Sequence, residues 1–559
     1  MAVFSVIDLL SVLAAANVVY FIGLAIYRLY FHPLAKYPGP LLWKLTQWCE
    51  TRSAWKGRRH IDLHLIHEQY GDIVRFGPDK LSFRTAQALY DIYTDRKANV
   101  IKTGWTHVGE TINPGLTTHV ISDRQLHAAR RKLLNNAFSD RAMNSLDKYM
   151  LEQIRKWCAY LGQASDSNSD DEGKQEKPAA AWCKERDMGQ WSTLLTLDVL
   201  GELCFGASFN AMKSGASYIT ELLLSSSRFQ QQVAFIPIRE LLFPLMKPAR
   251  LAVIGKLMRS KILLNKVRFR QDVSVYVEQR FAVEKSDAEK AEEDRRRDFF
   301  YYLLHAKDPQ TGDRFMPKDL IGEAALLIGA GSDTSSTAMS GLFFYLLRDE
   351  RVLARLQTEV RGAFDTVEDI RYSARLTSLP YLRACVDEAM RMTPPVPGLL
   401  DRLVLAGGAR IDGHDIPAGT TVGVPIYAIH HNERYFPKSF SYIPERWIAE
   451  DAETSSRVAG FTVTPSSVEV CRSAFHAFSS GPRGCVGKNM AYMELLTAVA
   501  RAMWLFDARL KPGDHSGEGG PQWNEPGRER VTEYQLKDWL ISDREGPIVQ
   551  FKPREGVSV

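Results

Sequence analysis

The order of apolar and polar residues separates a short leading segment from the rest of the chain. From Leu9 to Tyr27 the residues are almost all apolar, with Asn17 inside the run. A run of this length can cross a bilayer as one helix, because about 20 apolar residues suffice. No Lys or Arg precedes it, and Arg28, His32 and Lys36 follow it. This argues against a cleaved signal peptide and predicts a single-pass anchor that keeps the remainder in the cytosol.

Behind the apolar run, prolines and short periodic segments mark a change of structure. Residues 31 to 40 hold three prolines, which stop the helix and predict a stiff, extended spacer. Residues 70 to 78 alternate between apolar and polar and are bounded by Gly and Pro, as a strand pair should be. Residues 123 to 139 predict a helix that opens after Ser122, and residues 317 to 347 form a long apolar stretch.

Composition narrows the possible classes of protein. The chain has 559 residues, of which 45% are hydrophobic and 25% charged, as in an ordinary globular protein. A net charge of +5, without a Lys/Arg cluster interleaved with aromatic residues, argues against nucleic-acid binding. The seven cysteines are scattered without paired spacing, which indicates a reducing compartment rather than a disulfide framework.

Three histidines share one face of a predicted helix near the N-terminus. His60, His64 and His67 stand at positions i, i+4 and i+7, a spacing that could bind a metal. No Glu general base accompanies them and no distant third ligand suggests itself. An amphipathic surface helix explains the pattern better.

The stretch from Phe478 to Gly487 reads F-S-S-G-P-R-G-C-V-G and holds Cys485 in a loop of Gly and Pro. Its glycines allow turns that residues with a Cβ resist, and Pro482 stiffens it. A helical pattern starts directly behind, so a thiolate here would face the first free N–H groups of that helix, which lower the pKa of a thiol. The design suits an axial ligand of haem iron. The alternative is a structural cysteine in a strand-to-helix turn.

Gly329 and Gly331 interrupt the long apolar stretch in the sequence G-A-G-S-D-T-S-S, residues 329 to 336. Each glycine costs about 1 kcal/mol relative to alanine inside a helix, so the pair needs a reason. Close packing against another helix is one reason. A flat ring against this face, with a small ligand in a widened groove, is the other. Asp333 and Thr334 would then stand beside that groove as a carboxylate and a hydroxyl that relay protons.

The cysteine loop resembles the haem-binding loop of the cytochrome P-450 family, F-x-x-G-x-R-x-C-x-G, with every fixed position present. The family's acid–Thr pair matches position for position, and the resemblance covers about residues 38 to 555. It implies a mainly α fold with a small β region, in which the haem lies between the long central helix and the Cys loop. Residues 1–37 would form the membrane anchor and the start of a proline-rich hinge, and residues 38–559 the catalytic domain.

The resemblance also implies roles for single residues. Cys485 would be the axial haem iron ligand, and Thr334 and Asp333 the catalytic pair that manages protons. The haem would be bound by His127, Arg131, Arg402, Arg483, Phe478, Ala330 and Gly331. The family often has proline where this chain has Asp401, and an acid there is expected to compete for the neighbouring arginine.

Glu388 and Arg391 stand three residues apart on a predicted helix, a spacing that usually means a surface salt bridge of little energetic worth. Here two prolines end the helix at once, and a third partner follows in Y-I-P-E-R-W at Arg446. The combination looks like the family's Glu/Arg/Arg network, which clamps the meander beneath the haem. Its expected role is structural.

The implied function is that of a haem-thiolate monooxygenase, which inserts one oxygen atom from O2 into a small, mostly apolar substrate. The chain looks most like fungal members that tailor terpenoid, polyketide or alkaloid products. Heme b would be the cofactor. Electrons would come from NADPH through NADPH-cytochrome P-450 reductase, with cytochrome b5 as an optional donor, because the chain has no flavin or nucleotide motif. Candidate substrate-pocket residues are Val120, Val396 and Leu399.

The expected location is the endoplasmic reticulum membrane, with the catalytic domain facing the cytosol. Arg124, Arg130 and Lys132 are expected on a solvated basic face that could meet an acidic redox partner. Segments to which no function is assigned are 163–180, 282–297, 451–474 and 512–530.

Other functions stay open at this point. A benzoate-type aromatic-acid hydroxylase is the nearest primary-metabolic alternative. A haem-thiolate isomerase or dehydratase would need no reductase, but such enzymes often lose the acid–Thr pair. A non-enzymatic haem sensor or a membrane adaptor would have no use for that pair.

Overall fold

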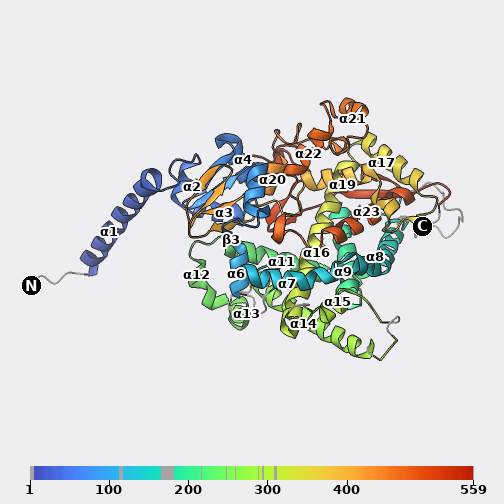
Figure 1. Ribbon diagram of the computed structural model, residues 1–559, viewed down its shortest axis with the longest axis horizontal. Helices are drawn as coiled ribbons and strands as arrows, with labels where there is room; N and C mark the ends of the chain where they lie inside the picture. The colour runs from blue at the N-terminus through green and yellow to red at the C-terminus, as the bar shows by residue number, and fades with distance from the viewer. Residues whose placement is uncertain are drawn as a thin grey trace, which may run out of the picture.

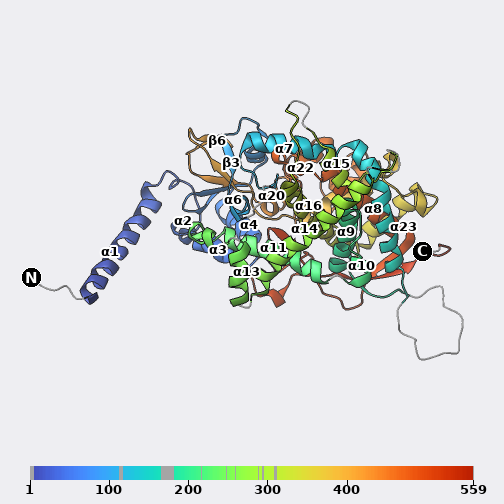
Figure 2. The same cartoon turned by 90° about the horizontal axis from the view of Figure 1, so that it is seen from below.

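The N-terminal helix stands apart from the body of the protein. A computed structural model describes residues 6–112, 117–164, 182–215, 217–246, 248–257, 260–287, 289–291, 295–307 and 311–557. Helix α1 (Val6–Ile26) and a π-helical turn (Tyr27–Phe31) project from one end (Figures 1 and 2). Within the described residues, Leu10–Phe31 is the one helical stretch long and apolar enough to cross a membrane. This confirms the predicted apolar helix.

The largest sheet in the described residues has five strands, in the order β1-β2-β8-β5-β3. Its strands are β1 (Ile73–Gly77), β2 (Lys80–Phe83), β3 (Val100–Lys102), β5 (Arg402–Val404) and β8 (Thr421–Gly423). The first two pair antiparallel, as the alternating pattern predicts. Strands β3 and β5 are also antiparallel, and Lys102 lies directly opposite Arg402.

Three smaller sheets complete the β region. They are formed by β4 (Arg186–Asp187), β12 (Ile548–Pro553) and β9 (Phe506–Leu510), by β6 (Ala409–Ile411) and β7 (His414–Ile416), and by β10 (Lys537–Trp539) and β11 (Ile541–Asp543). The rest of the regular structure is helical, so the prediction of a mainly α fold with a small β region is confirmed.

The long helix α16 (Pro317–Leu346) runs through the middle of the body, as predicted, with Pro317 at its first turn (Figures 1 and 2). It packs against α9 (Met188–Phe205), α14 (Lys261–Asp287), α19 (Pro380–Met392) and α23 (Lys488–Leu505). From Ser335 to Leu346 every residue of α16 is buried. The half that begins at Pro317 has a less buried side, which leaves it available to a cavity.

The remaining α-helices of the described residues surround this core. They are α2 (Leu41–Leu45), α3 (Trp48–Trp55), α4 (Arg59–Tyr70), α5 (Ala86–Leu89), α6 (Trp105–Ile112), α7 (Arg124–Ala137), α8 (Asp140–Leu161), α10 (Ala211–Ser214), α11 (Ser217–Ala234), α12 (Arg239–Leu242), α13 (Pro248–Leu257), α15 (Phe299–His305), α17 (Glu350–Ala363), α18 (Ala374–Thr377), α20 (Ile426–His430), α21 (Ala452–Ala459) and α22 (Pro465–Ala474).

The histidine face of α4 is buried, so the prediction of a surface helix is wrong. His60, His64 and His67 are at most 4% exposed, and the first two rings meet the ring of Tyr427 edge to face. Burial lowers the pKa of His64 to about 4 and that of His67 to about 3, so both rings are neutral at pH 7. No cluster of metal-binding side chains occurs among the described residues. Neutral imidazoles here fill the core as aromatic groups.

The unassigned segments take different structures. Residues 165–181, most of the predicted polar segment 163–180, lie outside the described residues. Residues 282–287 continue α14, and residues 451–474 contain helices α21 and α22. The segment 512–530 is a loop with one 3₁₀ turn, as its Gly and Pro content predicts.

Glu388, Arg391 and Arg446 form a fully buried network between α19 and the 3₁₀ turn Pro444–Trp447. Both Arg391 Nε and Arg446 Nε donate to the Glu388 carboxylate at 2.9 Å, and Trp447 Nε1 and the Ile443 N–H each donate to it at 3.0 Å. Burial alone would raise the pKa of Glu388, but the two guanidinium charges outweigh it and lower that pKa to about 2. One carboxylate thereby ties α19 to the segment that leads to the loop.

We predict that Glu388→Ala unfolds the region, because breaking a buried ion pair costs about 3–5 kcal/mol, and thereby abolishes incorporation of the haem that the family resemblance implies. Haem content per polypeptide and the urea midpoint of the purified protein measure the effect. Glu450→Ala, which removes an exposed carboxylate from the same region, is the matched control. Normal haem content in Glu388→Ala would contradict the structural role.

Candidate functional site

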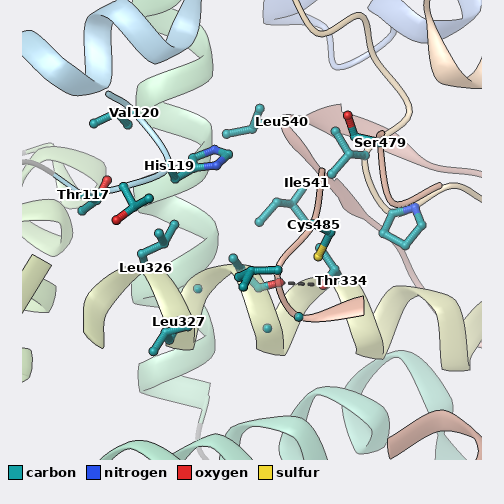
Figure 3. Close-up of a pocket in the computed structure, with 18 of the residues that line it drawn as sticks. Thr117, His119, Val120, Leu326, Leu327, Thr334, Ser479, Cys485, Leu540 and Ile541 are labelled. Atoms are coloured by element: carbon teal, nitrogen blue, oxygen red, sulfur yellow. Dashed lines mark hydrogen bonds between the residues drawn. The ribbon is translucent and has the colours of Figure 1, made fainter. Parts of the chain in front are cut away.

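One cavity of about 480 Å³ lies on the exposed side of α16. Figure 3 shows residues from four parts of the chain around it: Thr334 on α16, Cys485 before α23, His119 and Val120 in segment 117–122, and Leu540 in the C-terminal hairpin. The segments are far apart in sequence. The cavity is therefore built by the tertiary fold, and its volume lies in the range of small-molecule sites.

The loop that carries Cys485 is fixed to the π-helical turn Tyr90–Thr94. Gly481 has a φ of +66°, and a Cβ at this position would lie 2.1 Å from the Tyr93 carbonyl oxygen, so only glycine fits. Ser480 Oγ and Thr94 Oγ1 are hydrogen-bonded at 2.8 Å. The Cys485 N–H donates to the Phe478 carbonyl at 2.9 Å and closes the loop. These contacts hold the thiol against the cavity.

The surroundings of the Cys485 thiol differ from the expectation of a lowered pKa. Burial raises the pKa of Cys485, and the Gly487 N–H and the charges of Arg131 and Lys488 only partly oppose this effect. The direction is opposite to the expectation, although the Gly487 N–H at the start of α23 acts in the expected sense and Cys485 itself is exposed to the cavity. Metal binding, which deprotonates a coordinating thiol outright, would have to supply the driving force for ionisation.

Basic side chains gather at one end of the cavity. Arg131 of α7 donates to the Gly484 carbonyl at 2.7 Å, and Arg483 donates to the Ile121 and Ser122 carbonyls at 2.5 and 2.9 Å. Both guanidinium groups therefore join the cysteine loop to other segments while lining the cavity. His127, one turn before Arg131, also lines it, and burial together with the charge of Arg483 lowers the pKa of His127 to about 3.

Arg402 lines the same end, and Asp401 does not compete for it. The Arg402 guanidinium lies 4.9 Å from the centre of the Tyr93 ring and donates to the Asp401 backbone carbonyl at 3.0 Å. The Asp401 carboxylate instead accepts from Arg59 Nη2 at 3.3 Å. The expected competition is wrong because a buried arginine on α4, invisible in the local sequence, takes the acid.

On α16, Thr334 lines the cavity and its hydroxyl donates to the Ala330 carbonyl at 2.6 Å. Asp333, one position earlier, is not among the lining residues. Burial raises the pKa of Asp333 to about 6, against the opposing charge of Arg544. The structure therefore places the hydroxyl in the cavity and the carboxyl beside it.

The structure supports close helix packing at Gly331, and both helical glycines line the cavity. Ala330 and Gly331 line the cavity. A Cβ on Gly331 would also lie 3.0 Å from a methyl group of Leu200 on α9, which is tighter than ordinary packing. A Cβ on Gly329 would find Leu223 at an ordinary 3.7 Å. Helix packing thus restricts Gly331, while Gly329 is not restricted by the protein around it.

The lining residues fit a haem. An apolar wall faces a cysteine thiol, and cations that could meet two propionates lie at one end. Phe478 supports the loop by packing its ring against Tyr492 at 5.1 Å between centres. Expected site residues that line the cavity are His127, Arg131, Arg402, Arg483, Phe478, Ala330, Gly331, Thr334, Cys485, Val120 and Val396.

Leu399 is the exception among the expected pocket residues. It forms an isolated β-bridge with Pro425 and packs against Leu63 and Phe76, away from the cavity. Leu400 lines the cavity instead. Successive side chains of an extended chain point to opposite sides, so a choice between neighbours cannot be made without the register.

Two ionisable residues that contact segment 117–122, a wall of the cavity, were not predicted from the sequence. Glu323 on α16 is fully buried and accepts hydrogen bonds from the Thr118 N–H and hydroxyl, each at 2.6 Å. Lys102 on β3 lines the cavity and donates to the His119 carbonyl at 2.6 Å. Neither residue belongs to a motif. A Glu inside an apolar helical stretch was the one available signal, and for Lys102 the sequence offers none.

Comparisons with known proteins point to one family. The sequence model of the family described as Cytochrome P-450 matches residues 33–518. The chain is similar to the cytochrome P-450 monooxygenase poxM of Penicillium oxalicum, with 34% identity over 95% of this chain and 93% of the relative. The corresponding values are 32%, 98% and 97% for fscF of Fusarium equiseti, and 32%, 94% and 93% for atnE of Emericella nidulans.

We predict that Glu323→Ala loosens segment 117–122, while Glu323→Gln, which keeps an acceptor oxygen, leaves it in place. Unpartnered buried hydrogen-bond donors cost about 1–3 kcal/mol, so amide exchange at Thr118 should be faster by about tenfold in the alanine variant. Hydrogen exchange followed by mass spectrometry measures this. Equal exchange in Glu323→Ala and the natural protein would show that the segment is held by other contacts.

Proposed function

The chain belongs to the cytochrome P-450 family as a monooxygenase, and we propose that it inserts one oxygen atom from O2 into a small, mostly apolar fungal secondary metabolite. The observation that carries the proposal is the shared cavity of Cys485 and Thr334. A thiol ligand alone would serve any haem-thiolate protein. Oxygen activation requires, in addition to the thiol ligand, a hydroxyl group on the facing helix.

We propose that the cofactor is heme b, with Cys485 as axial ligand and His127, Arg131, Arg402 and Arg483 around its propionates. Bound there, the haem would supply the oxygen and electron chemistry, which no amino-acid side chain supplies. The protein orients the cofactor. The loop contacts would hold the sulfur at the iron, and the basic groups would bind the negatively charged propionates at one edge of the haem.

The second role of the protein is to transfer protons to the site of reaction. The Thr334 hydroxyl, on the cavity wall, can accept and donate a hydrogen bond to a small ligand. Asp333 beside it has a pKa raised to about 6, so it can exchange protons near neutral pH. We propose that Asp333 takes protons from outside the cavity and that Thr334 orients their delivery within it.

The substrate class is supported by the cavity wall and by the relatives. Leu223, Leu326, Val396, Leu540 and Ile541 give the space an apolar lining. The similar proteins named above are monooxygenases of fungi. We propose a terpenoid, polyketide or alkaloid skeleton on this basis. An isomerase or dehydratase reaction is disfavoured because the Thr334 hydroxyl would have no task in it.

We propose that residues 1–37 are the anchor and the start of the hinge, and residues 38–559 the catalytic domain on the cytosolic face of the endoplasmic reticulum. The apolar stretch Leu10–Phe31 supports a membrane location. Arg28 donates to the Leu45 carbonyl at 2.5 Å, a contact that ties the end of the anchor to the body. NADPH-cytochrome P-450 reductase would deliver the electrons, and cytochrome b5 could assist.

A microsomal assay tests the proposal. Microsomes that contain the protein and the reductase are incubated with NADPH and a panel of fungal terpenoids, polyketides and alkaloids, and products are identified by mass spectrometry with ¹⁸O₂. One ¹⁸O atom in a product that requires NADPH is the expected result. If the substrate is converted equally well without NADPH, and the product contains no ¹⁸O, the monooxygenase reaction on that substrate is refuted.

We predict that Thr334→Ala lowers product formed per NADPH by about 10²-fold, because a positioned proton-transfer group contributes about 10²–10⁴-fold. Hydrogen peroxide release should rise in compensation, and both quantities are measured in the same assay. Thr334→Ser retains the hydroxyl and should retain most product. Full coupling of Thr334→Ala would exclude a proton role for this residue.

A further inference from the structure

The cavity has more positive charge than the expected arginines account for. Lys102, Arg131, Arg402 and Arg483 line it, and Asp401 is the only carboxylate among the described residues that do so. That carboxylate is engaged by Arg59. A haem brings two propionates. Lys102 is the one of these four cations that is not among the expected haem-binding residues.

Strand pairing makes the position of Lys102 energetically unfavourable without an anion. Lys102 and Arg402 are register partners in the antiparallel pair β3–β5, and both line the cavity. Side chains directly opposite each other on one face have Cβ atoms about 5 Å apart, and like charges there repel. No carboxylate lies within ion-pair distance of Lys102 in the described part of the chain. An anion held between the two strands would turn repulsion into attraction.

The neighbours of Lys102 indicate which anion. Burial lowers the pKa of Lys102 well below its ordinary value, and the charges that lower it further are those of Arg402, Arg483 and Arg131. These are three of the arginines that the proposed haem site assigns to the propionates, so Lys102 lies within the same group of cations. Its ammonium is held in place by the His119 carbonyl at 2.6 Å.

We propose that Lys102 is a further propionate-binding residue, which acts with Arg402 across strands β3 and β5 to hold one haem carboxylate. The inference rests on the proposed haem site and adds a residue to it. The same ammonium links the cofactor to segment 117–122 through His119. The carboxylate bound to Lys102 would thereby stabilise a wall of the substrate cavity, since Thr117, Thr118, His119 and Val120 all line it.

Two substitutions separate the charge of Lys102 from its hydrogen bond. Lys102→Gln can still donate to the His119 carbonyl but carries no charge, whereas Lys102→Arg keeps the charge. Lys97→Gln, at an exposed position just before β3, is the control. The measurements use the full-length holoprotein: the rate of haem transfer to excess apomyoglobin, and the haem reduction potential.

Charge-assisted hydrogen bonds are worth clearly more than neutral ones, so haem transfer should be about tenfold faster in Lys102→Gln. The reduction potential should become more negative, because a cation near the haem favours the reduced state. Lys102→Arg and Lys97→Gln should behave as the natural protein does. A purely structural lysine would instead show rescue by glutamine and no change in potential, and that pattern overturns the proposal.

Binding of the anionic probe laurate, followed by the haem spectrum, tests the other possible anion. If Lys102→Gln weakens laurate binding while haem transfer and potential stay unchanged, Lys102 binds a substrate carboxylate and the proposal is wrong. Failure of the proposed haem site itself is recognised separately. In that case the natural protein, before any substitution, lacks the spectrum of a thiolate-ligated haem.

Discussion

Repulsion among the basic groups at one end of the cavity is the constraint on which the site depends. Lys102 and Arg402 face each other across two strands, and Arg131 and Arg483 approach from α7 and the cysteine loop. A dianionic ligand would make this arrangement favourable. Cys485 lines the same cavity. One molecule with negative charge at its edge and a metal at its centre would therefore satisfy both the cations and the thiol.

The rest of the fold holds these groups at their places. Glu388 joins two buried guanidinium groups and connects α19 to the chain before the cysteine loop. Gly481 brings that loop into contact with Tyr93, whose ring lies under Arg402. Asp401 is bound by Arg59 on α4 and leaves Arg402 to the cavity. Buried ion pairs of this kind stabilise little in themselves, but removal of one partner is costly, so they fix geometry.

Motif residues could be predicted from the sequence because loop chemistry is local. The cysteine loop, the Asp333–Thr334 pair and the long helix each have a signature within ten or thirty residues. The predictions that the structure contradicts concerned residues whose surroundings are set by contacts between segments distant in sequence. The histidine face of α4 is buried against Tyr427, and Leu399 forms a bridge to Pro425 instead of lining the cavity. The proposed role of Lys102 could not be predicted either, because it depends on the strand register that pairs Lys102 with Arg402.

The proposed site requires that Cys485 presents a thiolate to haem iron in this cavity. Reduction of the purified protein under carbon monoxide, followed by absorption spectroscopy, tests it most directly. We expect the strongly red-shifted Soret band of a thiolate-ligated haem, and we expect this band to be absent from a Cys485→Ala variant that is otherwise folded. A Soret band at the position typical of histidine-ligated haem in the natural protein, or the same band with and without Cys485, would contradict the account.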